Sequence, residues 1–87
     1  MSETMKLLEK ALLVQNGADW ARELGISRTA FSLAKNRGHM SPAIAGAVAE
    51  KLGYDAMQWI AVAALESEKD SSCKSRMVRK FGKITLL

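Results

Sequence analysis

Residues 16–38, NGADWARELGISRTAFSLAKNRG, constrain the fold of this chain more than any other stretch. They contain two short apolar patterns with helical spacing. Gly25 separates the patterns and accepts the left-handed backbone with which many helices end. Ala21 is small enough for a second helix to cross close to the first. The spacing therefore predicts a helix over 17–24, a sharp turn, and a second helix over 27–37.

This arrangement is the pattern of a helix-turn-helix, whose second helix can lie in the major groove of DNA. Ile26 is placed to fill the angle between the helices, Ser27 is a favoured N-cap residue, and Phe31 anchors the second helix to the core. The segment ARELGISRTAFS resembles phage-type repressors and Cro proteins, which share its order of Ala, Gly, aliphatic residue, Ser, apolar anchor and Ser. The resemblance covers the motif over 17–38 and the number of helices over 4–66. It implies a lambda-repressor-like fold.

Start and stop signals along the chain predict an all-α fold, a bundle of five helices. The first helix runs from Ser2 or Thr4 to Val14, and the fourth starts after a Ser41 cap. The fifth starts after a cap at Asp55. Its apolar stripe, expected to face the core, comprises Met57, Ile60, Ala61, Ala64 and Leu65.

Composition favours helices and offers little material for enzyme chemistry. The chain has 87 residues, enough for one modest core; 48% are hydrophobic and only one is Pro. One Cys and one His are too few for an internal disulfide or a zinc site, so we expect no metal and no cofactor. We find no nucleophile–base pair and no Gly-rich phosphate loop, and we expect no enzyme. The sequence has neither a signal peptide nor a run of about 18 apolar residues, which favours the bacterial cytoplasm or nucleoid and no membrane partner.

Positive charge concentrates in two places, which suits a polyanionic partner. The net charge is +4, yet residues 1–70 carry 8 Lys/Arg against 9 Asp/Glu, whereas 71–87 carry 5 Lys/Arg and no acid. A second window without acidic residues spans 24–49. The alternative is a solvated surface with a disordered basic tail. We divide the chain into a helix-turn-helix domain (1–69) and a basic C-terminal tail (70–87), which forms a short helix or a dimer arm.

The resemblance to phage-type repressors implies roles for individual residues. Arg28, Thr29 and Ser32 match positions that contact base edges, and an arginine can bind guanine O6 and N7 in a bidentate manner. Phosphate contacts, which fix position without reading sequence, are expected from a wider set. That set comprises Ser27, Lys35, Asn36, Arg37, Lys74, Arg76, Arg79 and Lys80. Simpler explanations are a cap for Ser27, a solvated side chain for Arg28, and charges that offset a helix C-terminus for the basic residues before Gly38.

Aromatic and apolar residues after the motif suggest a dimer contact. Trp59 is first of all a candidate core residue, and a dimer contact is its alternative. The tail has three alternatives: an arm that tracks phosphates, a dimer arm, or a flexible segment; of these we favour a mixed role of dimer contact plus phosphate contact. The candidate dimer contacts are Trp59, Met77, Phe81, Ile84 and Leu86.

The expected function is that of a sequence-specific DNA-binding regulator, a repressor of phage or mobile-element origin. It would bind a palindromic operator in double-stranded DNA as a homodimer, with half-sites about 34 Å apart and the helix over 27–37 in the major groove. The alternative is a protein-interaction module, such as an antitoxin, antirepressor or adaptor. Such a module would bind a regulatory protein partner through the fifth helix and the tail.

Overall fold

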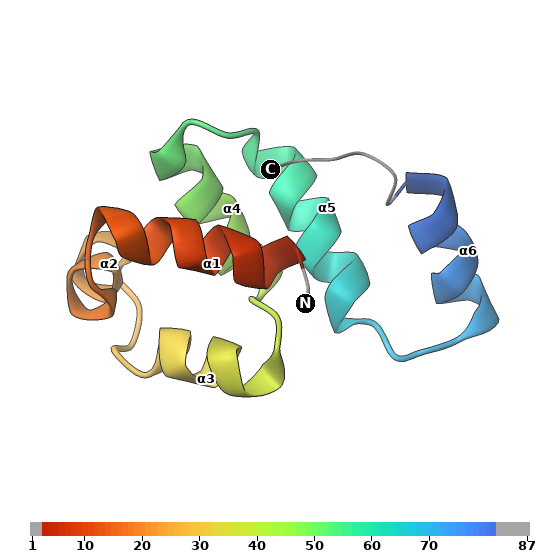
Figure 1. Cartoon of the computed structure of the whole chain (residues 1–87), viewed down its shortest axis with the longest axis horizontal. Helices are drawn as coiled ribbons and strands as arrows, with labels where there is room; N and C mark the ends of the chain where they lie inside the picture. Colours follow the sequence, from red (N-terminus) through yellow and green to blue (C-terminus); the bar gives the residue numbers. More distant parts are fainter. Residues whose placement is uncertain (1–2, 82–87) are drawn as a thin grey trace.

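The computed structural model describes residues 3–81, which form six helices and no strand. In chain order these are α1 (Glu3–Val14), α2 (Gly17–Leu24), α3 (Ala30–Arg37), α4 (Pro42–Leu52), α5 (Ala56–Ser67) and α6 (Ser72–Phe81). The all-α prediction is confirmed. In Figure 1, α1 lies across the middle with α4 above it and α3 below it, α5 runs past the N-terminal end of α1, and α6 stands beside α5 at the end of the molecule remote from α2.

Most helix ends lie where side chains with capping roles predict them. The side chains of Asn16, Ser41 and Asp55 accept hydrogen bonds from backbone N–H groups in the first turns of α2, α4 and α5. These bonds satisfy donors that a helix start leaves unpaired. Gly25 and Gly38 end α2 and α3 with φ angles of 70° and 81°, a region that L side chains rarely adopt. The predicted bounds of α2 and the predicted start of α4 are therefore confirmed.

Two tryptophans dominate the core. Trp20 on α2 and Trp59 on α5 are each only 1% exposed, and both belong to one apolar cluster with residues of α1, α3 and α4. The indole Nε1 of Trp20 donates a hydrogen bond of 2.8 Å to the carbonyl oxygen of Ala11, which fastens α2 to α1. At Gly46, α4 and α5 approach so closely that a Cβ atom there would lie 2.6 Å from Ile60 Cγ1. The core thus sets how α2 and α3 stand on the rest of the bundle.

The start of α1 is joined to the end of α5 by a polar network. The hydroxyl of Thr4, which is fully buried, donates to Glu66 Oε1, and Glu66 Oε2 accepts a 2.8 Å bond from the N–H of Glu3. The same Thr4 oxygen accepts a 3.1 Å bond from the N–H of Met40, in the loop before α4. Glu66, in the last turn of α5, therefore caps the first turn of α1.

The buried face of α5 differs from the predicted one. Trp59 and Ala63 face the core, whereas Met57 is 75% exposed and Ala61 and Ala64 are exposed as well. The predicted stripe is therefore wrong: the face of α5 that packs against α1 and α4 carries the large indole of Trp59, and the face with Met57 is left open. The suggestion that Trp59 is a dimer contact is wrong for the same reason, and its assignment to the core is confirmed.

The tail contains a helix, α6, which agrees with the short helix given as one alternative for residues 70–87 and brings the described residues to six helices. Ser71 caps it, since its Oγ accepts a 3.0 Å bond from the N–H of Lys74. Met77 is half-buried on this helix, and Phe81 is its last residue. Two of the suggested dimer contacts, Ile84 and Leu86, lie outside the described residues.

Candidate nucleic-acid interface

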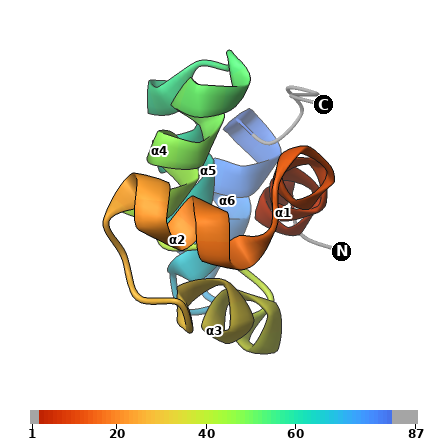
Figure 2. The ribbon, with the colours of Figure 1, turned by 90° about the vertical axis from the view of Figure 1, so that its left-hand side faces the viewer.

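The turn between α2 and α3 begins at the left-handed Gly25. The N–H groups of Gly25 and Ile26 both donate to the carbonyl oxygen of Ala21, which closes the last turn of α2. Ile26 is half-buried and packs against the core cluster, as does Leu24 just before the turn. Figure 2 shows the chain descending from α2 through this turn to α3. The apolar contacts on both sides of Gly25 therefore fix the direction in which α3 leaves.

The helix α3 begins at Ala30, later than the predicted start at residue 27. Ser27 does not cap it: its Oγ accepts a 3.2 Å bond from the N–H of Thr29, and its carbonyl oxygen accepts a 3.0 Å bond from the N–H of Ala30. Thr29 occupies the N-cap position without a side-chain bond to the helix. A serine hydroxyl can close a local turn as readily as it can cap a helix, and here the turn forms. The predicted capping role of Ser27 is wrong.

One face of α3 is buried and the opposite face is open. Phe31 and Ala34 are 5% and 6% exposed and join α3 to the core. With about 3.6 residues per turn, the positions on the opposite face are Thr29, Leu33 and Asn36, and all three are exposed. We call Thr29, Leu33 and Asn36 the outward row. Leu33 was not among the predicted site residues, although its spacing from the buried pair already places it on the open face.

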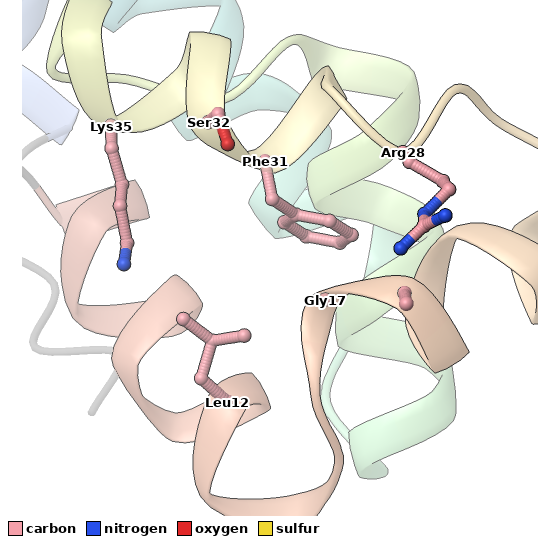
Figure 3. A pocket seen from close by; sticks show the side chains of 7 residues that line it. Leu12, Gly17, Arg28, Phe31, Ser32 and Lys35 are labelled. Carbon is pink, nitrogen blue, oxygen red and sulfur yellow. The ribbon is translucent and has the colours of Figure 1, made fainter.

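A hollow of about 270 Å³ lies beside the outward row, between α3 and the α1–α2 junction (Figure 3). Leu12, Gly17 and Phe31 line it together with three polar residues of the α3 segment, which are Arg28, Ser32 and Lys35. In Figure 3 the guanidinium of Arg28 extends toward Gly17, at the start of α2, and the Lys35 side chain extends toward α1. Neither cation has an ion pair among residues 3–81. The hollow thus carries two uncompensated positive charges along one edge of α3.

The predicted phosphate-contact residues fall into two separate groups. Ser27, Lys35, Asn36 and Arg37 are exposed around α3, whereas those on α6 lie at the other end of the molecule (Figure 1). The α6 residues are Lys74, Arg76, Arg79 and Lys80. The ammonium of Lys74 donates a 2.8 Å bond to the carbonyl oxygen of Glu68 and lies 3.4 Å from the Asp70 carboxylate. Lys74 is therefore engaged at the start of its own helix.

Glu23 is the last acidic residue before the acid-free window. Gln15 donates a 2.7 Å hydrogen bond to its Oε2, and Lys51 Nζ lies 3.4 Å from its Oε1. The hydrogen bond from Gln15, and then Lys51, lower the pKa of Glu23 below its ordinary value. The charge of this carboxylate is thus partly balanced by Lys51 on α4, while the neutral amide of Gln15, in the link between α1 and α2, holds it by a hydrogen bond.

No family model, curated protein or solved structure matches the chain. Within the part of the chain that the structure describes, no cluster of His, Cys, Asp and Glu side chains could hold a metal ion. None of the described helices combines the length and apolar character that a bilayer span needs. The functional argument therefore rests on α3 and its surroundings.

Proposed function

We propose that this protein is a sequence-specific DNA-binding regulator in which α2 and α3 form a helix-turn-helix. The observation that carries the proposal is the open, acid-free face of α3, with Arg28 and Lys35 along one edge and Arg37 along the other, three cations that have no ion pair within residues 3–81. DNA presents base edges in its groove with a phosphate backbone on each side. On α3 the exposed row of Thr29, Leu33 and Asn36 likewise lies between two edges that carry cations, so the row matches the base edges and the cations match the two backbones.

In this proposal the outward row faces base edges and the edges of α3 meet phosphates. Ser32 sits between the outward row and the hollow and keeps its expected place at the bases. Because Arg28 extends toward Gly17, we assign it and Lys35 to phosphates of one strand, in place of the guanine contact that the sequence suggested for Arg28. The N-terminus of α2 adds backbone N–H groups and a favourable dipole on the same side.

We propose further that the protein acts as a homodimer on a palindromic operator, with α1–α5 as the DNA-binding unit. Closed twofold symmetry is the commonest form of assembly, and it matches half-sites about 34 Å apart. In place of Trp59, we assign the contact between copies to the exposed apolar face of α5 around Met57 and Ile60. The resemblance to phage-type repressors supports repression as the activity, in the bacterial cytoplasm or nucleoid.

The test is selection of bound duplexes from a random pool by the purified full chain, followed by gel shifts over a salt series. We expect an enriched palindrome and an affinity that falls steeply with salt, since each neutralised phosphate contributes about 0.9 to the log–log slope. Lys35→Gln should reduce that slope by about 1 in each half-site. Lys69→Gln, in the exposed link between α5 and α6, is the matched control and should leave the slope unchanged. A pool without enrichment contradicts the proposal.

The second candidate function is a protein-interaction module, an antitoxin, antirepressor or adaptor. The exposed apolar face of α5 favours it, and Val78 on the neighbouring α6 is 41% exposed as well. Sedimentation of the wild type and of Met57→Lys discriminates between the two functions. A regulator should dissociate to monomers in Met57→Lys and lose operator affinity. A chain that is monomeric in both forms and enriches no duplex favours the module.

A further inference from the structure

Leu33 is an aliphatic residue at the centre of the open face of α3. Its side chain is 46% exposed, while Phe31 and Ala34 on the same helix are 5% and 6% exposed. A lone exposed leucine elsewhere on a protein needs no explanation. The position of Leu33 is different, because it stands between Thr29 and Asn36, in the row that the proposed function directs at the base edges.

The chemistry of the major groove limits what such a side chain can recognise. Leu33 has neither a donor nor an acceptor, so it cannot bind the polar groups of guanine, cytosine or adenine. Placed against them, it would displace water without replacing its hydrogen bonds. The C5-methyl of thymine is the one apolar group that the groove presents. An aliphatic residue pointing at base edges therefore favours a thymine.

Asn36 offers a second base contact beside Leu33, through hydrogen bonds instead of an apolar surface. It lies three residues after Leu33, hence on the same side of α3, and is exposed. Its side-chain amide has no hydrogen bond within residues 3–81. An asparagine amide can bind the N6 and N7 groups of adenine in a bidentate manner. Leu33 and Asn36 are thus adjacent groups suited to the two bases of A·T pairs.

We propose that Leu33 determines specificity by contacting a thymine methyl, so that each half-site carries an A·T pair beneath the centre of α3, with Asn36 on a neighbouring adenine. The inference rests on the proposed function, since it assumes that α3 enters the groove. It names the class of operator that the chain binds: one in which affinity depends on the thymine methyl group at the base pair beneath the centre of α3 in each half-site.

The experiment removes that methyl group alone. After selection of the operator, each thymine of the site is replaced in turn by deoxyuridine, at symmetric positions in both half-sites, and affinities are measured with the full chain. At one thymine per half-site we expect a loss of about fourfold for each methyl, or about fifteenfold for the pair. Leu33→Ala should bind thymine and uracil versions with nearly equal affinity. Leu13→Ala, at an 86% exposed leucine of α1, should keep the full difference.

The outcomes separate the inference from the function on which it rests. If the chain selects a site in which deoxyuridine changes no affinity, or a half-site without thymine, the inference is overturned while DNA recognition stands. It is also overturned if Leu33→Ala retains the thymine preference. If no duplex is enriched, both fail together, and the random pool alone reports that result.

Discussion

Replacement of Thr4 by valine tests whether the buried polar network holds α1, α5 and the loop before α4 together. Valine has almost the shape of threonine but lacks the hydroxyl. Thr4→Val therefore leaves the Met40 N–H without its 3.1 Å acceptor and removes a donor from Glu66. The core around Thr4 keeps its apolar contacts, so the loss of stability reports on the hydrogen bonds.

Two terms set the magnitude. A buried amide N–H left without a partner costs about 1–3 kcal/mol, and a hydrogen bond to a charged group contributes about 1.5–3 kcal/mol. Glu66 keeps its bond from the Glu3 N–H and lies only partly buried, so the second term takes its lower value. We expect a loss of about 3 kcal/mol in the free energy of unfolding. For a domain of this size that corresponds to a fall in Tm of roughly 12–24 °C.

Urea unfolding followed by tryptophan fluorescence measures this loss, because Trp20 and Trp59 are buried and change environment on unfolding. Thr4→Ser is the matched control: it keeps the hydroxyl and loses one methyl, at a cost of about 0.8 kcal/mol. Equal stabilities of the valine and serine variants would refute the reasoning, since the hydroxyl would then contribute nothing.

Two further predictions concern packing and charge. Gly46→Ala should lower the free energy of unfolding by about 1–2 kcal/mol more in the wild type than in an Ile60→Ala background, because the new Cβ would lie 2.6 Å from Ile60 Cγ1. Urea unfolding of the four chains of this double-mutant cycle measures the difference, and equal losses in the two backgrounds would contradict the contact. Gln15→Ala should raise the pKa of Glu23 toward its ordinary value, as measured by NMR titration, and Lys51→Met should raise it less. Because this pKa is lowered in the folded chain, the stabilisation by Glu23 is present above the ordinary pKa and is lost as pH falls through the lowered one. An unchanged pKa in Gln15→Ala would show that the amide has no such effect.

Helix boundaries were predictable wherever neighbouring residues alone decide them. The N-caps Asn16 and Ser41 bind N–H groups, and Gly25 ends its helix by a left-handed turn, all within a few residues of their own positions. The corresponding boundaries of α2 and α4 agree with prediction. Ser27 marks the limit of that logic, because a serine hydroxyl can either close a local turn, as it does here with the N–H of Thr29, or cap a helix. Sequence spacing cannot decide between a turn that ends at Ala30 and a cap for a longer helix.

Contacts between distant residues were not predictable. Periodicity gives α5 two apolar faces, and the choice between Trp59 and Met57 depends on the space left by α1 and α4. Thr4 and Glu66 are 62 residues apart, and no local pattern indicates their hydrogen bond. In the candidate site, the outward position of Leu33 follows from spacing alone, whereas the direction of Arg28 toward Gly17 required the three-dimensional arrangement.

The carboxylate that caps α1 from the end of α5 brings the first and last turns of a five-helix segment within bonding distance of each other. The two ends of the segment are therefore close enough for a short peptide linker to join them while the backbone is opened in another loop, which is a circular permutation. The exposed Gly53, between α4 and α5, is a natural place for the opening. In such a circular permutant the segment from α1 to α4 would keep its order, and α5 would lead the chain.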